Sequence, residues 1–206
     1  MMSNQLKNTL NTLTLLWSQT SLLFSSCIEV NFYREKFNTH IANYDKSITL
    51  DKVVISGLLN YNLIVICSFL DEWNNEFNPI KIPEYSERIL KIKTYTKPIF
   101  KRINKWTGLK NYRNVVLAHN LRAKGGHSIF ESSQFNYNIP HDPTEMLLLS
   151  SLINLAMINT INEFKEISFD VEKAIRNFFQ SNKEKIDTEG ELAQIRKELE
   201  ILKNDN

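Results

Sequence analysis

Apolar residues recur along much of the chain at the three- and four-residue spacing of an amphipathic α-helix. The first series consists of Leu6, Leu10, Leu13, Trp17, Phe24 and Cys27. The second consists of Ile55, Leu59, Asn62, Ile66, Leu70, Trp73 and Phe77, and apolar neighbours widen its stripe. Each series predicts a long helix, and the wider stripe predicts a second helix that is buried on several sides.

Proline residues punctuate the chain after the second series. Pro79 and Pro83 predict the end of the second helix and the start of a third near residue 83. Pro98 lies inside this third helix and predicts that the helix is kinked or split there. Residues 109–122 predict a fourth helix.

The C-terminal third of the chain begins with a helix start signal. Asp142 is a capping residue and Pro143 occupies the first helical position, so a fifth helix is predicted to run to about residue 167. A sixth helix is predicted over residues 170–179. The stretch before Asp142 mixes β-forming and polar residues and is compatible with a short β-hairpin near 128–139.

Composition favours an all-α fold. The chain has 206 residues, of which 42% are hydrophobic, and only 5 Gly and 5 Pro supply turns. This length suits one sizeable domain. We therefore predict a helical domain over residues 1–183, followed by a polar helical tail over residues 184–206.

The cysteines and the uncharged segments of the sequence indicate where in the cell the protein is expected. Cys27 and Cys67 are far apart, which gives neither a disulfide framework nor a zinc site of the usual spacing, and no cofactor is expected. Residues 53–70 carry no charge, but Ser, Gly and Asn interrupt them and they barely reach spanning length. We predict a buried core helix there, no membrane partner and a cytoplasmic location, with a membrane-associated sensor as the alternative.

Charge is concentrated in one part of the chain. The net charge is +2, yet residues 81–124 hold twelve basic and two acidic residues, a local charge of +10. Aromatic residues are interleaved with these cations. Cations that neutralise phosphates and aromatics that stack on unpaired bases suit single-stranded nucleic acid. The alternative is a solvated basic helix with its aromatic residues in the core.

Within this basic segment the sequence Tyr112 to Arg122 gathers groups that could act on a phosphodiester. On a helix, Tyr112, His119 and Arg122 share one face, and the long side chain of Arg113 reaches around to it. Arg113 can clamp a phosphate, Asn114 can hydrogen-bond a sugar, and His119 can move a proton near neutral pH.

This motif resembles the R-x(4–6)-H signature of the HEPN superfamily, in which a polar residue, often Asn, follows the Arg. Arg113, Asn114 and His119 match it, and the surrounding sequence is similar to toxin–antitoxin and phage-abortive members. The resemblance implies an antiparallel helical bundle and a metal-independent endoribonuclease whose two protomers join their motifs. Leu121 stands where HEPN toxins that are silenced by nucleotidylation carry a Tyr.

The function predicted from the sequence is therefore RNA cleavage by 2′-OH attack, of the toxin or phage-defence type, by a homodimer. The catalytic residues would be Arg113, Asn114 and His119, with His127 as an alternative second proton carrier to the partner's histidine. An antitoxin or a sensor protein would be a further partner. The predicted RNA-binding residues are Lys97, Lys101, Arg102, Lys105, Tyr112 and Arg122. The rival hypothesis is a non-catalytic helical module that binds RNA or protein.

Overall fold

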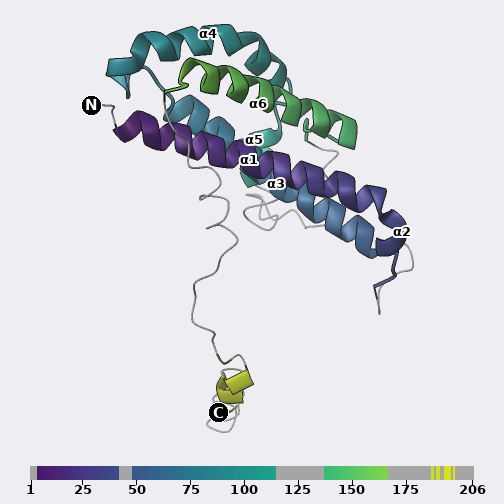
Figure 1. Ribbon diagram of the computed structural model, residues 1–206. Helices are drawn as coiled ribbons and strands as arrows, with labels where there is room; N and C mark the ends of the chain where they lie inside the picture. The colour runs from purple at the N-terminus through teal and green to yellow at the C-terminus, as the bar shows by residue number, and fades with distance from the viewer. Residues whose placement is uncertain are drawn as a thin grey trace, which may run out of the picture. The chain divides into compact units, whose positions relative to one another are not determined.

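The structure is a computed structural model that describes residues 4–41, 48–114 and 137–166, together with a few positions between 187 and 197 (Figure 1). Contacts divide the chain into two compact units, residues 1–175 and 176–206. In the described residues the regular structure is helical and contains no strand, only an isolated bridge between His40 and Thr49. The prediction of an all-α protein is confirmed.

The first unit is built from two long helices and the helices that pack beside them. The elements are α1 (Asn4–Phe32), α2 (Arg34–Phe37), α3 (Leu50–Asn75), the 3-10 turn η1 (Pro83–Tyr85), α4 (Ser86–Ile103), α5 (Leu109–Tyr112) and α6 (Pro143–Glu163). Helices α1 and α3 run antiparallel along their length, with α2 at the end where they join, and α6 lies against both α1 and α4 (Figure 1).

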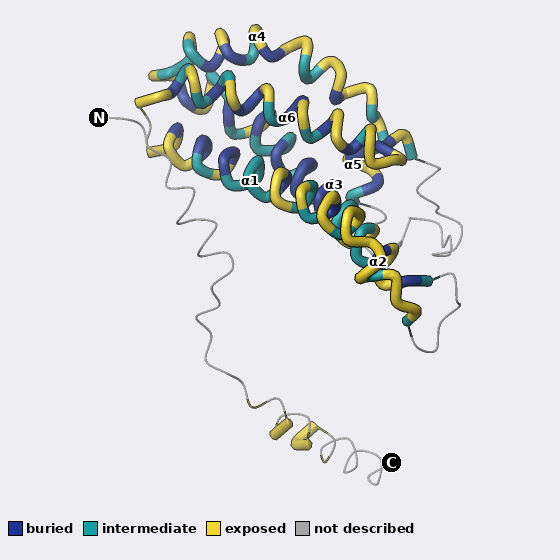
Figure 2. Tube along the Cα trace, turned by 45° about the vertical axis from the view of Figure 1, so that its right-hand side comes forward, coloured by how far each residue is buried: buried dark blue, intermediate teal, exposed yellow. Residues whose placement is uncertain are grey.

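The core follows the two predicted apolar series. Leu6, Leu10 and Leu13 of α1 are fully buried, and so are Ile66 and Phe69 of α3. Figure 2 shows the buried residues along the faces that the helices turn toward one another. Aromatic rings join α3 to α4, because Trp73 stacks on Phe100 with ring centroids 4.7 Å apart. The periodic apolar spacing therefore identified the faces that form this core.

The start of α6 is as predicted. The Asp142 side chain accepts a hydrogen bond from the Glu145 amide at 2.8 Å, and Pro143 is the first helical residue. The Glu145 carboxylate in turn accepts from the His141 amide, also at 2.8 Å. These bonds satisfy donors that the first helical turn leaves unpaired, which fixes where the helix begins.

Helix α4 runs through Pro98, so of the two predicted outcomes, a kink or a split, the split does not occur. The helix continues from Ser86 to Ile103 with Pro98 inside it. Proline removes the hydrogen bond to the carbonyl four residues earlier, that of Thr94. Both Thr94 and Pro98 are exposed, and water can solvate a carbonyl there.

Several other predictions fall outside the described residues. These are most of the hairpin predicted over residues 128–139, of which only residues 137–139 are described and form no strand, the sixth helix over 170–179, the boundary at 183 and most of the helical tail. The predicted fourth helix is described over its first turns, as α5 and a π-helical turn at Arg113 and Asn114.

By length and composition, two helices of the described part, α3 and α6, are apolar enough to cross a bilayer. Core helices of water-soluble proteins pass the same test. In the structure one face of each helix packs within the bundle and contributes buried residues to its core.

Gly57 and Gly108 give a matched stability prediction, because a Cβ would meet backbone at one and open space at the other. A Cβ on Gly108 would lie 2.7 Å from the Asn138 backbone nitrogen, whereas a Cβ on Gly57, inside α3, meets nothing within 4 Å. We expect Gly108→Ala to lower the free energy of unfolding by about 1–3 kcal/mol, because backbone must move. Gly57→Ala should raise it by about 0.5–1 kcal/mol by improving helix propensity. Urea unfolding of both variants checks the signs, and a neutral Gly108→Ala would contradict the close approach.

Candidate functional site

The predicted residue Arg113 is held by a carboxylate from another helix. Its Nη1 lies 2.6 Å from Asp71 Oδ2 of α3, and its Nε donates to Asn114 Oδ1 at 3.0 Å. The Arg113 side chain is 17% exposed. Two bonds on different guanidinium nitrogens fix the plane of the group, and Nη2 forms no hydrogen bond with a described residue.

Asp71 is also approached by Lys110, whose Nζ lies 3.6 Å from Asp71 Oδ1. Partial burial acts to raise the pKa of the Asp71 carboxyl, but the hydrogen bond and charge of Arg113, together with Lys110, outweigh it and hold that pKa below its usual value. The carboxyl is thus ionised at neutral pH. The cluster of Asp71, Lys110 and Arg113 consequently carries one net positive charge.

A hollow of about 340 Å³ opens beside this cluster. It is lined by polar side chains from the end of α3 and the α4–α5 turn, namely Asp71, Asn74, Asn104, Thr107, Lys110 and Arg113, and by apolar neighbours. Cys67 lies at its wall, where burial raises the pKa of the thiol to about 11. The thiol is therefore protonated at neutral pH and is a poor nucleophile.

Tyr112 differs from its predicted role. Only 4% of it is exposed, its hydroxyl donates to Asn60 Oδ1 at 3.2 Å, and its ring meets Tyr137 edge to face at 5.3 Å. Burial raises the pKa of this hydroxyl, with Tyr137 adding to the effect. A ring packed in this way is not available to stack on a base, so Tyr112 anchors α5 to α3 instead.

Four of the predicted cations line a groove along α4 and the turn after it. We call it the α4 groove and define it as Lys97, Lys101, Arg102 and Lys105 with Thr94 and Pro98. All four cations are exposed, and they line a hollow of about 570 Å³. Arg102 donates to the Pro98 carbonyl at 2.9 Å. Within the described part of the chain, no carboxylate forms an ion pair with Lys97, Lys101 or Lys105.

The basic residues that precede this groove are neutralised or turned inward. Lys91 Nζ lies 2.6 Å from Glu163 Oε2, and Arg88 binds both Glu163 and Glu166. The half-buried Lys93 donates to the Trp73 carbonyl at 2.8 Å, and burial lowers the pKa of its ammonium group. Among the described residues 86–105, the exposed cations without a carboxylate partner therefore lie in the second half of α4 and the turn that follows it.

The aromatic residues of the basic segment mostly belong to the bundle. Phe100 stacks on Trp73, and Tyr85 and Trp106 pack against the core cluster. Tyr95, by contrast, is 68% exposed. Tyr95 is thus exposed as stacking on a base would require, whereas Tyr85, Phe100 and Trp106 pack against the core as the alternative predicted.

His119, Arg122 and His127 lie outside the described residues, so the catalytic histidine and one predicted phosphate contact stay predictions.

Asp71 was missed by sequence reasoning. It precedes Arg113 by 42 residues, and no local spacing connects the two. The only sequence signal was an acid at the polar end of an otherwise apolar helix.

No group of three or more His, Cys, Asp or Glu that could hold a metal occurs in the part of the chain that the structure describes.

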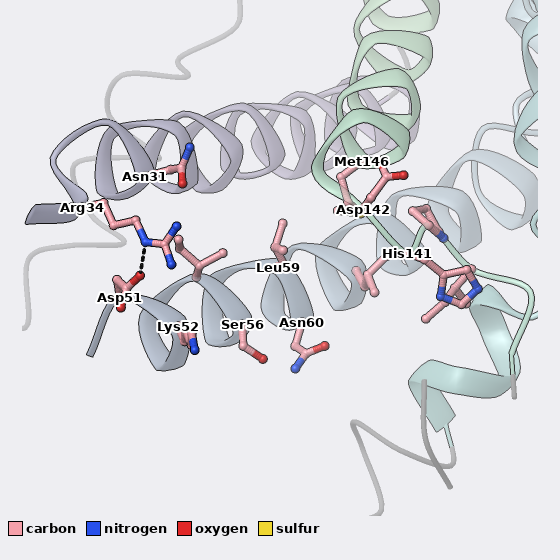
Figure 3. Close-up of a pocket in the computed structure, with 14 residues that line it drawn as sticks. Asn31, Arg34, Asp51, Lys52, Ser56, Leu59, Asn60, His141, Asp142 and Met146 are labelled. Atoms are coloured by element: carbon pink, nitrogen blue, oxygen red, sulfur yellow. Dashed lines mark hydrogen bonds and ion pairs between the residues drawn. The ribbon is translucent and has the colours of Figure 1, made fainter. Parts of the chain in front are cut away.

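Sequence reasoning also missed another pocket. It lies between the end of α1, α2, the start of α3 and the start of α6 (Figure 3). Its volume is about 340 Å³. Arg34 Nε lies 2.9 Å from Asp51 Oδ2, and the Thr49 hydroxyl donates to the other oxygen of Asp51. We call this cavity the α2 pocket. Its residues come from segments more than 100 positions apart, which sequence spacing does not reveal.

Comparison with known proteins found no matching family model, curated protein or solved structure. The functional argument therefore rests on the motif at Arg113 and on the geometry around it.

Proposed function

We propose that the protein is a metal-independent endoribonuclease of the toxin or phage-defence type, with Arg113, Asn114 and His119 as its catalytic residues. The observation that carries the proposal is an oriented arginine, fixed by Asp71 and Asn114, close in sequence to an exposed groove of unpaired cations. The motif's resemblance to the HEPN superfamily supplies the reaction class.

Arg113 would stabilise the reacting phosphate. In cleavage by internal attack, the ribose 2′-oxygen bonds to phosphorus and the bond to the 5′-oxygen breaks, and negative charge builds up on the non-bridging oxygens. A preorganised guanidinium stabilises that charge without first having to reorient. The Asp71–Arg113 ion pair therefore gives Asp71 the role of a positioning residue.

His119 would move a proton in this reaction. One group removes the 2′-hydroxyl proton and another delivers a proton to the departing 5′-oxygen, which leaves a 2′,3′-cyclic phosphate and a 5′-hydroxyl. Each motif supplies one histidine, so we propose that two protomers join their motifs in a homodimer. An antitoxin or sensor protein that controls this activity belongs to the same proposal, as does action in the cytoplasm.

The α4 groove would hold the RNA. Lys97, Lys101, Arg102 and Lys105 are exposed, and cations on one helix face neutralise successive phosphates of a strand. Tyr95 on the same helix offers an exposed ring. Arg122 would contribute a further phosphate contact.

The experiment that tests the proposed function is RNA cleavage in excess chelator. The purified full chain should cut single-stranded RNA at the same rate with and without EDTA, because proton transfer and charge stabilisation come from side chains. A His40→Ala variant, which alters an exposed histidine outside the motif, should cut normally. RNA that is bound but never cut would favour the rival function, a non-catalytic binding module.

Salt dependence tests the α4 groove. We expect Lys97→Gln/Lys101→Gln to weaken RNA binding and to reduce the slope of log K against log salt by about 1.4, since single-stranded RNA releases about 0.7 counterion per contact. The matched control is Lys81→Gln/Lys91→Gln, which removes the same charge from lysines that Glu76 and Glu163 already pair. Equal slopes for the two double variants, from fluorescence anisotropy titrations, would contradict the assignment of the groove.

A further inference from the structure

The α2 pocket has the features of a small-molecule site, and this inference does not depend on the proposed function. Its wall combines a fixed cation with apolar side chains, and it adjoins a second cavity of about 150 Å³. The two cavities share Asn31, Ile55 and Leu59. Polar groups at one end and an apolar recess at the other are typical of sites for amphipathic ligands.

The polar end is organised around Arg34. Asp51 is almost completely buried, and its carboxylate is satisfied by Thr49 on one oxygen and by Arg34 Nε on the other. Arg34 itself is 57% exposed, and its Nη1 and Nη2 form no hydrogen bond with a described residue. Figure 3 shows Arg34 and Asn31 pointing into the same space above α3. Two guanidinium donors and an amide are thereby available to an anion.

The apolar end is formed by side chains of three helices. The smaller cavity is lined by Phe24, Cys27 and Ile28 of α1, by Ile55 and Leu59 of α3 and by Pro143 of α6. Leu59 points up from α3 into the space between the helices (Figure 3). Burial raises the pKa of the Cys27 thiol, so no charge lies at this end.

We propose that the α2 pocket binds a small carboxylate with an apolar chain. The carboxylate would accept hydrogen bonds from Arg34 Nη1 and Nη2 and from the Asn31 amide, a paired geometry that guanidinium and carboxylate share. The chain would enter the recess lined by Phe24 and Leu59. Asp51 is bound by Thr49 and by Arg34 Nε, which leaves Nη1 and Nη2 of Arg34 for a carboxylate, and Lys52 and Asp142 on the same wall add one charge of each sign.

The test compares octanoate with octanamide, which has the same chain length and no charge. Isothermal titration should give octanoate a dissociation constant at least about tenfold lower, since charge-assisted bonds to Arg34 are lost in the amide. Arg34→Lys keeps a cation beside Asp51 but lacks the two parallel donors, and should remove most of this preference. Equal affinity for the two probes, or a preference that Arg34→Lys leaves intact, would overturn the proposal.

Two further variants keep the test decisive if Arg34→Lys does not fold. Asn31→Asp adds a negative charge without touching the Asp51 pair and should weaken octanoate about tenfold while sparing octanamide. Leu59→Phe fills the recess and should weaken both probes. Lys97→Gln/Lys101→Gln should leave octanoate binding unchanged, and a loss there would assign the binding to the α4 groove and refute the α2 pocket.

Discussion

Replacing His119 by alanine is expected to abolish RNA cleavage. A positioned acid or base contributes about 10²–10⁴-fold to a proton-transfer reaction, and in a site that joins two motifs the substitution removes both proton carriers. The turnover rate should therefore fall by at least about 10³-fold. RNA binding should persist, because the exposed cations of α4 are unchanged.

Loss of the fold has to be separated from loss of chemistry. Circular dichroism and the thermal midpoint of His119→Ala should match those of the parent chain, and His40→Ala provides the histidine control. A folded His119→Ala chain that cleaves RNA at the parent rate would exclude His119 from the reaction.

Replacing Arg113 by alanine is expected to lower the turnover rate by about 10²–10³-fold, since it removes one charge-stabilising donor from the reacting phosphate. The loss should fall on kcat more than on KM, because the interaction strengthens as charge develops in the transition state. Single-turnover kinetics at saturating RNA separate the two parameters.

The matched control for Arg113→Ala is Arg88→Ala. Arg88 is likewise an arginine bound by carboxylates, those of Glu163 and Glu166, but it lies on the neutralised half of the basic segment. Arg88→Ala should lower stability and leave kcat unchanged. If Arg113→Ala raised KM alone, Arg113 would be a binding residue and Asp71 would lose its positioning role.

The helices were predictable because burial leaves a periodic trace in the sequence. The apolar series of α1 and α3 coincide with buried faces, and Asp142 with Pro143 marked the start of α6. The sequence left open whether Pro98 kinks or splits α4, and the helix runs through it where the orphaned Thr94 carbonyl is exposed to water. Exposure of that kind is a tertiary property.

The surface charge was predictable only in part, because ion pairs between distant helices also depend on tertiary packing. A count of cations does not reveal that Glu163 neutralises Lys91 from 72 residues away, nor that Lys93 turns toward Trp73. The motif identified Arg113 and Asn114, but the partner that orients Arg113 comes from α3 and is set by helix packing. Tyr112 was predicted to bind RNA because it lies among cations in the sequence, but in the structure its ring is buried in the core.

The most direct measurement is the chemistry of the RNA ends that the protein produces in excess EDTA. Mass spectrometry of a defined oligonucleotide should find 2′,3′-cyclic phosphates and 5′-hydroxyls with the parent chain, and intact RNA with His119→Ala purified in parallel. Ends carrying a 3′-hydroxyl and a 5′-phosphate, or cleavage that ceases when the metal is chelated, would contradict the account.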